Sequence, residues 1–358
     1  MYKSIDIHNF RGIKSLHAEG LRRINLIVGR NNSGKSTFLE AMKLLGEPTN
    51  PGIAATIGIL RAQRLAANEL EAMWRPMFHE MNPNSPIELN GQWNEEEHER
   101  KLLINPIRSI IINTKSQNDN LSTNLSAPPS SEVSIGGLIL TCINFDGSEY
   151  ETQVVVDATV GGLNVQNLAL DSVIPSGFIS ARANTPDIYL SQRYSEIVRR
   201  KGKGKILSIM NIIDANIMSV EVIASASGSS IYVDLGKDFL IPLLVCGEGT
   251  VRLFSIVVEL MLLHDGTLLI DEIDNGLHYS VMKEFWEKLD ELAKQLNVQI
   301  VATTHNEEMM RLALNVFADK PGTLGLFRID RKADRHVFTA YDDEAMQAVA
   351  EYDFEVRG

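Results

Sequence analysis

The sequence predicts an α/β fold in which a mainly parallel sheet is covered by helices on both faces. The first observation is a phosphate-loop pattern at residues 29–36, placed between a short apolar strand and a helix. The second is the last third of the chain, where apolar strands alternate with helical segments. The third is that the pieces of the expected site lie near both ends of the sequence, which predicts one head interrupted by an insertion.

Composition bounds the class of protein. The chain has 358 residues, 44% of them apolar, and a formal net charge of −12 at pH 7. This length allows one large domain or two of ordinary size, and the apolar fraction excludes global disorder. Such an acidic chain is not a general nucleic-acid coat, because phosphate binding depends on Lys and Arg. The two cysteines, Cys142 and Cys246, have neither a zinc spacing nor a disulfide framework, which fits a reducing cytoplasm.

Neither a signal peptide nor a membrane span is expected. Residues 1–20 carry charges throughout and lack the apolar run of a signal peptide. The apolar segment 253–263 is shorter than the roughly 18 residues of a span, and Glu259 interrupts it. We therefore expect a core helix there and a cytoplasmic protein with no membrane partner.

The first 46 residues predict a strand pair, a phosphate loop and a helix. Residues 5–10 alternate between apolar and polar, as in a half-buried strand, and a turn at 11–12 lets residues 16–18 pair back. Residues 24–28 form a short buried strand. Residues 36–45 have apolar side chains at helical spacing.

The helical pattern stops at Glu47, because Pro48, Pro51 and Gly52 end the first helix. We expect an α+β insertion over residues 47–173 and a discontinuous head made of residues 1–46 and 174–358. Its predicted elements are a helix at 57–81, strands at 87–93 and 107–113, a mobile polar loop at 115–132, and a hairpin of 137–145 with 149–156. No sustained heptads appear in the insertion, so a coiled-coil rod is not expected.

Strands and helices alternate through the rest of the chain. Before residue 247 we expect a strand at 173–180, helices at 187–200 and 205–215, and strands at 220–225 and 230–235. The regular last third then predicts a helix at 248–263, a strand at 267–270, a helix at 279–296, a strand at 299–303, a helix at 306–316, and strands at 324–330 and 336–340.

The phosphate loop fits the pattern G-x-x-x-x-G-K-[ST] and is followed by Thr37. Its residues are Gly29, Arg30, Asn31, Asn32, Ser33, Gly34, Lys35 and Ser36. The two glycines let successive backbone N–H groups point at one phosphate, and the helix N-terminus adds partial positive charge. In this motif Lys35 reaches the β- and γ-phosphates and the Ser36 hydroxyl ligates Mg²⁺.

Two later strands end in polar residues. Asp271 and Glu272 follow the apolar strand 267–270. By itself this would be a solvated acidic turn, but beside a phosphate loop Asp271 is expected to hold Mg²⁺ and Glu272 to orient the attacking water. His305 ends the next buried strand and is expected to face the γ-phosphate. The alternative is a histidine that only caps the helix after it.

A set of motifs in a fixed order carries a resemblance. The matching segments are 5–12, 29–36, 247–252, 269–278 and 302–305. With them the sequence resembles the ABC-type ATPase heads of the RecF, SMC and OLD group, specifically their small AAA-family ATP-binding relatives. The resemblance covers about residues 1–46 and 176–358. It implies a P-loop head that binds ATP with Mg²⁺ and hydrolyses it.

The resemblance also implies a homodimer or higher homo-oligomer, in which two heads enclose two ATP molecules. The loop Gly247-Glu248-Gly249 of one head would contact the γ-phosphate held by the other. From the residues alone, these glycines would only begin a helix. Asp274 and Asn275 would form the D-loop, and His305 would be the switch histidine. The usual signature serine falls at Cys246, whose thiol is a weaker donor than a hydroxyl.

The biological use has two readings. One is a switch in anti-phage defence or DNA maintenance that works with a separate effector. By resemblance to OLD proteins, many of which carry a Toprim-class nuclease after the head, we expect a separately encoded partner to supply such a nuclease. The other is a slow ATP-dependent regulatory or scaffold module that holds a partner protein. DNA could contact a basic cluster, although we favour a solvated helix end for it. The cluster consists of Arg193, Arg199, Arg200, Lys201, Lys203 and Lys205.

Overall fold

The computed structural model describes residues 1–48, 50, 52–54, 74–94, 98–110, 133–157, 162–166, 173–181, 187–226, 228–332 and 335–351. The predicted loop at 115–132 and most of the predicted helix at 57–81 lie outside these residues. The described end of that helix is instead two short 3₁₀ turns, η1 (Arg75–Met77) and η2 (His79–Met81). Pro76 is the second residue of the first turn, and an isolated bridge pairs Phe78 with Phe10, so a continuous α-helix does not form here.

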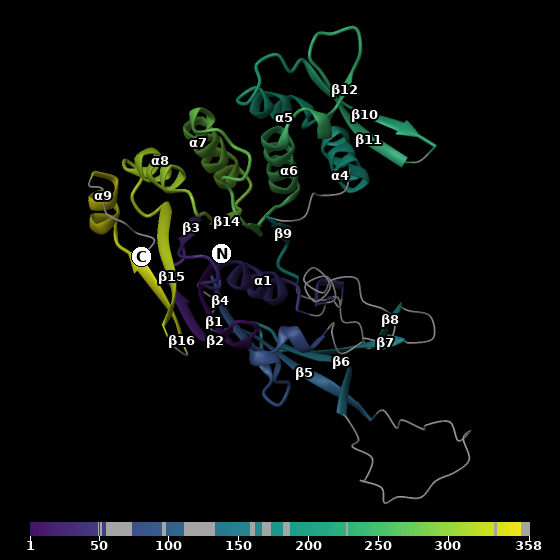
Figure 1. The fold of residues 1–358 in the computed structure, drawn as a ribbon, viewed down its shortest axis with the longest axis vertical. Coiled ribbons are helices and arrows are strands. Elements are labelled where there is room, and N and C mark those ends of the chain that lie inside the picture. The colour runs from purple at the N-terminus through teal and green to yellow at the C-terminus, as the bar shows by residue number, and fades with distance from the viewer. Residues whose placement is uncertain are drawn as a thin grey trace, which may run out of the picture.

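A six-stranded central sheet confirms the predicted α/β class (Figure 1). Its strands, in spatial order, are β16 (Arg335–Tyr341), β15 (Leu324–Lys332), β3 (Ile24–Val28), β14 (Gln299–Thr303), β13 (Thr267–Ile270) and β9 (Ser176–Ile179). All pairings are parallel except that of β15 with β16. Because the strands are parallel, the residues that follow β3, β13 and β14 gather at one edge of the sheet.

Helices cover one face of this sheet (Figure 1). They are α4 (Asp187–Arg199), α5 (Lys203–Met210), α6 (Glu248–Leu262), α7 (Tyr279–Gln295), α8 (Glu307–Phe317) and α9 (Asp343–Glu351). The predicted helix at 205–215 ends at Met210, because the N–H groups of Ile212 and Ile213 bond to carbonyls three residues back, at 3.1 and 3.0 Å, so the chain continues as tight turns. Helix α9 was not predicted. A small sheet of β10 (Ser219–Ser225), β11 (Gly228–Asp234) and β12 (Ile241–Pro242) lies beyond α4.

Helix α1 (Lys35–Gly46) lies on the other face, between the central sheet and a second sheet (Figure 1). The second sheet has the order β2 (Ile13–Glu19), β1 (Tyr2–Phe10), β4 (Ile87–Trp93), β5 (Arg100–Ile110), β6 (Val133–Ile143), β7 (Glu149–Asp157) and β8 (Gly162–Gln166). Strand β5 begins before the predicted 107, because residues 100–104 already pair with β4.

The strands of residues 47–173 continue a sheet that the N-terminal strands begin, since β1 pairs with both β2 and β4. The proposed boundaries of the insertion remain a prediction. Gln299 joins the two sheets at the start of β1. Its buried amide accepts from the Tyr2 N–H and donates to the Tyr2 and Arg22 carbonyls, all at 2.9 Å.

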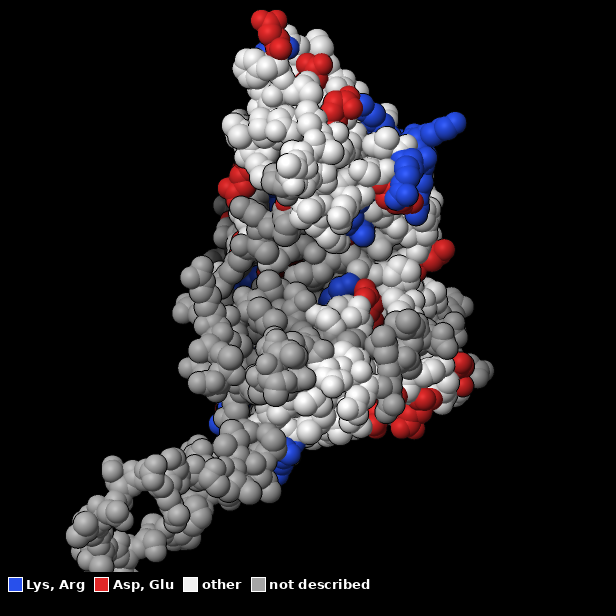
Figure 2. Space-filling model, turned by 90° about the vertical axis from the view of Figure 1, so that its right-hand side faces the viewer, with Lys and Arg blue, Asp and Glu red and all other residues white. Residues whose placement is uncertain are grey.

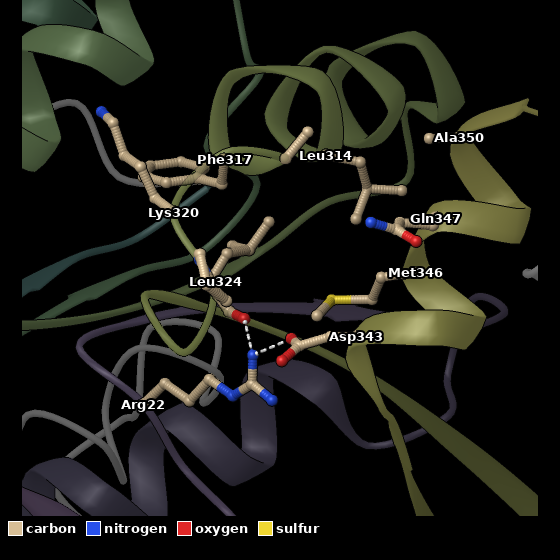
Figure 3. A pocket seen from close by; sticks show the side chains of 11 residues that line it. Arg22, Leu314, Phe317, Lys320, Leu324, Asp343, Met346, Gln347 and Ala350 are labelled. Carbon is tan, nitrogen blue, oxygen red and sulfur yellow. Dashed lines mark hydrogen bonds and ion pairs between the residues drawn. The ribbon is translucent and has the colours of Figure 1, made fainter.

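Helix α9 closes a small pocket of about 80 Å³ against α8 and the start of β15 (Figure 3). Arg22 reaches across its mouth, donating to the Leu324 carbonyl at 2.8 Å and to Asp343 at 2.5 Å. Leu324 pairs with Ile24, the first residue of β3, so this pocket lies at the opposite end of β3 from the phosphate loop. Among the described helices, none is long and apolar enough to cross a bilayer.

Candidate active site

The phosphate loop turns on two glycines with left-handed backbone angles. Gly29 has φ 144° and Gly34 has φ 101°, and both lie between β3 and α1 as predicted. A Cβ on Gly29 would lie 2.4 Å from the Ile329 carbonyl oxygen of β15, so only glycine fits. Between the glycines, Arg30, Asn31 and Asn32 are exposed, whereas Ser33 is buried.

Lys35 points back into the loop. Its ammonium donates to the Gly29 carbonyl at 2.8 Å and to the Arg30 carbonyl at 2.9 Å, and the residue is 5% exposed. Burial lowers the pKa of Lys35 to about 8, although the nearby carboxylates of Asp271 and Glu272 act in the opposite direction. The loop therefore holds a cation whose present partners are two backbone carbonyls. A bound phosphate could take the place of these carbonyls as the partner of the ammonium.

Asp271 lies at the centre of a hydroxyl network. One of its carboxylate oxygens, Oδ1, accepts from Ser36 Oγ at 3.0 Å and from Thr303 Oγ1 at 2.8 Å. These groups come from α1, from the residue after β13 and from the end of β14. The structure thus brings the two predicted metal-binding residues, Ser36 and Asp271, into direct contact.

This pair fits a magnesium ion in its chemistry and spacing. Mg²⁺ prefers oxygen ligands, and one or two carboxylates with substrate phosphates commonly complete its shell. Two neighbouring ligands of an octahedral Mg²⁺ lie about 3 Å apart, given bonds of about 2.1 Å, which matches the 3.0 Å between Ser36 Oγ and Asp271 Oδ1. No group of three or more His, Cys, Asp or Glu side chains is placed to bind a metal within the described ranges. An ion here would therefore rely on phosphate oxygens.

Glu272 sits in a constrained turn directly after Asp271. Its φ is 54°, in the left-handed region, and its N–H donates to Thr303 Oγ1 at 2.8 Å. Non-glycine residues in this region cost free energy and recur at functional sites. The side chain is 40% exposed and reaches within 3.8 Å of His305 Nε2. Glu272, predicted to orient the attacking water, and His305, predicted to face the γ-phosphate, are therefore neighbours.

The environment of His305 favours the neutral imidazole. Burial and, next, the positive charge of Lys35 lower the pKa of His305, while the carboxylates of Glu272, Asp274 and Asp271 partly offset this. The preceding residue, Thr304, donates to Asp274 at 2.5 Å and so connects the end of β14 to the predicted D-loop.

The predicted signature loop lies beside the D-loop of the same chain. Gly247 has φ 105° and precedes α6, whose first two residues are Glu248 and Gly249. A Cβ on Gly249 would lie 2.1 Å from the Gly276 carbonyl oxygen, so the two backbones touch. Asn275 donates to the Ala181 carbonyl at 3.3 Å, which connects this turn to the chain after β9.

Two residues of the site were not assigned a role from sequence. Thr303 binds both Asp271 and the Glu272 backbone, as described above. Arg252 of α6 is 9% exposed and donates to the carbonyls of Ser180 at 2.8 Å, of Glu272 at 3.1 Å and of Asp271. Both belong to segments of the family pattern, and that adjacency was the only sequence signal for them.

The predicted basic cluster gathers on the face that carries α4 and α5 (Figure 2). Carboxylates neutralise much of it. Arg193 pairs with the buried Glu259 at 2.7 Å, Arg199 and Arg200 both pair with Glu196, and Lys203 pairs with Glu221 at 2.5 Å. This pairing favours the solvated helix end, and the DNA contact stays a prediction.

The fold and these contacts define an ABC-type ATPase head of the RecF/SMC group, as the sequence resemblance implied. The chain belongs to the family described as "AAA domain, putative AbiEii toxin, Type IV TA system", whose model matches residues 73–311. A second model, "AAA ATPase domain", matches residues 1–134.

Individual relatives agree with this assignment. An "ATP/GTP phosphatase" of Helicobacter pylori is 24% identical over 356 residues, which cover 89% of each chain. The "DNA replication and repair protein RecF" of Nitrosococcus oceani is 45% identical over 42 residues, 12% of each chain. In fold, the chain resembles an Smc head solved with the C-winged helix domain of ScpA, with a TM-score of 0.54 and 14% identity over 97% of this chain and 99% of that one.

Proposed function

We propose that this chain binds ATP and hydrolyses it by in-line attack of water on the γ-phosphate. The observation that carries the proposal is the side chain of Glu272, which lies 3.8 Å from His305 at the edge of the sheet where Lys35, Ser36 and Asp271 meet. A carboxylate, a neutral imidazole and a buried ammonium around one point suit a reaction that depends on positioning and electrostatic stabilisation.

Each residue has a distinct role in this proposal. The loop 29–37 and Lys35 bind the phosphates, because backbone N–H groups and the ammonium face the same place. Glu272 accepts a hydrogen bond from the attacking water and polarises it. His305 donates to the γ-phosphate, and Ser36 and Asp271 hold the metal. Mg²⁺, when bound, would neutralise charge that develops on the phosphate oxygens.

We further propose that two heads close around two ATP molecules, with Gly247, Glu248 and Gly249 of one head contacting the nucleotide of the other and Asp274 and Asn275 linking the two sites. Exposed apolar side chains flank these loops. Val245 is 73% exposed and Leu244 51% exposed just before the signature loop, and Tyr279 is 55% exposed just after the D-loop. Exposed apolar residues gathered near a functional loop are typical of an interaction surface.

The dimer would serve as an ATP-driven switch. We propose that it acts in the cytoplasm, in anti-phage defence or DNA maintenance, together with a separately encoded effector. The family description, which names a toxin of a toxin–antitoxin system, and the short match to RecF support these two settings.

The first experiment is to measure the mass in solution of Glu272→Gln with and without ATP and Mg²⁺. The amide keeps the size of the side chain but cannot take a proton, so we expect turnover to fall about a hundredfold or more while ATP binding persists. If unhydrolysed ATP stays trapped between two heads, the protein should remain a dimer and its mass should double. Glu287→Gln, on the exposed side of α7, makes the same chemical change away from the site and should behave as wild type.

Two results would contradict this function. Wild-type turnover by Glu272→Gln would remove the role given to Glu272. A mass that stays monomeric with ATP would remove the two-head arrangement and leave the phosphate loop as a site within one chain. A third result, a dimer already present without ATP, would show that surfaces other than the ATP-binding loops hold the assembly together.

A further inference from the structure

Arg252, in the second turn of α6, is a buried cation whose hydrogen bonds all go to backbone carbonyls. Its Nη1 donates to the Ser180 carbonyl, directly after β9, at 2.8 Å. Its Nη2 donates to the carbonyls of Asp271 and Glu272, the second at 3.1 Å. The residue is 9% exposed, and among the described residues no carboxylate lies at ion-pair distance from it. The guanidinium therefore acts on the backbone of the Asp271–Glu272 turn and not on an acidic side chain.

The backbone of Glu272 is held on both of its polar sides. Its N–H donates to Thr303 Oγ1 at 2.8 Å, and its carbonyl accepts from Arg252 Nη2 and from the Asn275 N–H, both at 3.1 Å. With φ 54°, Glu272 has a conformation that non-glycine residues keep only where the surrounding structure enforces it. The backbone fixes the direction of the Cα–Cβ bond, so the place of the Glu272 carboxylate depends on these contacts.

The chemistry of the guanidinium explains why an arginine occupies this position. Its donors lie in one plane in a fixed fork, so a single side chain can bond carbonyls of two segments at once, here Ser180 and the Asp271–Glu272 turn. The ammonium of a lysine is compact and rotates freely, so it has no such fixed reach. Arg252 therefore joins the end of β9 to the Asp271–Glu272 turn in one geometry.

The same helix begins with the predicted signature loop. Gly249 lies three residues before Arg252, and a Cβ on it would lie 2.1 Å from the Gly276 carbonyl oxygen. The first turns of α6 therefore rest on residues 271–276 at two points, through the backbone of Gly249 and through the side chain of Arg252. A shift at the start of α6 would consequently reach the Asp271–Glu272 turn.

We infer that Arg252 is a positioning residue for the proposed hydrolysis, which aims the Glu272 carboxylate at the attacking water by holding the carbonyl side of its turn. The inference rests on the role in hydrolysis proposed for Glu272. Arg252 acts through the backbone of Glu272 and not by contact with the reacting atoms. It thereby ties the carboxylate of one head to the helix that begins with the signature loop of the same head.

Steady-state ATP turnover by Arg252→Lys in the presence of Mg²⁺ tests this inference. Lysine keeps the positive charge but cannot hold the carbonyls in one geometry. We expect kcat to fall about tenfold to a hundredfold, because a displacement of about 1 Å in a catalytic group can cost about a hundredfold. The KM for ATP, and the affinity for a non-hydrolysable ATP analogue measured by calorimetry, should stay within about threefold of wild type, because the phosphate loop is unchanged.

A double-mutant cycle with Glu272→Gln separates positioning from a general loss of structure. If Arg252 acts only through Glu272, adding Arg252→Lys to Glu272→Gln should slow turnover by no more than about twofold further. An effect of Arg252 that is independent of Glu272 would instead multiply with the loss caused by Glu272→Gln.

Arg193→Lys is the matched control. Arg193 also holds α6, through two contacts of 2.7 Å with the Glu259 carboxylate, but it does so from α4. The control should lower the melting temperature and leave kcat within about twofold of wild type, because it loses a bidentate pair and no contact with the Asp271–Glu272 turn. Thermal melts of all variants check folding. If lysine at position 252 prevents folding, Arg252→Gln, which also removes the buried charge, replaces it with the same expectations.

Three outcomes would overturn the inference. The first is a wild-type kcat in Arg252→Lys while Glu272→Gln is slow. The second is a pair of losses that multiply in the double variant. The third is an equal fall of kcat in Arg193→Lys, which would show that turnover follows the packing of α6 in general. Wild-type turnover by Glu272→Gln would instead overturn the proposed role of Glu272 itself, so the two failures are distinguishable.

Discussion

At the scale of single residues, the surroundings of Lys35 act on its charge in two opposite directions. Its ammonium is 5% exposed and bonded to two loop carbonyls, yet burial alone would favour the neutral amine. The balance places its pKa at about 8, well below that of a free lysine. A phosphate bound beside it would favour the charged form, so the bound-state pKa must be higher than the free-state pKa.

ATP affinity should therefore depend on pH above neutrality. The full affinity is present below the free-state pKa of about 8, because Lys35 is already charged there. It is lost as pH rises from that value toward the bound-state pKa, by up to about tenfold per unit. Equilibrium ATP binding between pH 7 and 10 measures this. Lys35→Arg keeps its charge throughout, so its curve should be flatter than that of the wild type. A wild-type affinity that is constant up to pH 10 would contradict the assignment.

The principal residues of the candidate site could be predicted from sequence because each motif is a run of neighbouring residues. Ser36, Asp271 and His305 follow strands or loops whose pattern is local, and the structure brings them together at one edge of the sheet. Thr303 and Arg252 act through contacts with residues some 20 to 70 positions away. No local pattern reports such contacts.

At the scale of elements, most strands and helices follow from periodicity, and the errors have physical causes. Strand β5 is longer than its apolar run because β4 pairs with its polar beginning. Helix α9 was missed although it begins with two acidic residues, Asp343 and Glu344, which are favourable in a first helical turn. Its place against α8 is a tertiary contact that a local pattern does not report.

The start of α6 depends on a contact between two glycines. Because a Cβ on Gly249 would lie 2.1 Å from the Gly276 carbonyl oxygen, Gly249→Ala should push α6 away from the D-loop and cost about 1–3 kcal/mol of unfolding free energy. A Cβ on Gly204, inside α5, would meet no atom within 4 Å, so Gly204→Ala should stabilise the protein by about 0.5–1 kcal/mol. Urea unfolding of both variants tests this, and equal effects would show that the Gly249 contact is not restrictive.

At the scale of the whole molecule, two hydrophobic cores share one sheet. Leu268 belongs to the core beneath the helices, whereas its neighbour Leu269 belongs to the core around α1 and the second sheet. Successive residues of a strand face opposite sides, so every central strand contributes to both cores. If the central sheet unfolds, both cores therefore lose residues that they contain. We therefore expect the described head to unfold in one cooperative transition.

Gln299 tests this coupling, because its amide joins the second sheet to the central one. Gln299→Leu keeps the volume but leaves the buried N–H and carbonyl of Tyr2 without these partners, at about 1–3 kcal/mol for each unsatisfied group. We expect one transition at lower denaturant, seen alike by backbone circular dichroism and by tryptophan fluorescence, since Trp93 lies in the second sheet and Trp286, on α7, lies in the core that the helices cover. Gln295→Leu, the same change at an exposed position of α7, should shift the midpoint little. Two separate transitions would show instead that each core folds alone and that ATP-driven motion could arise between them.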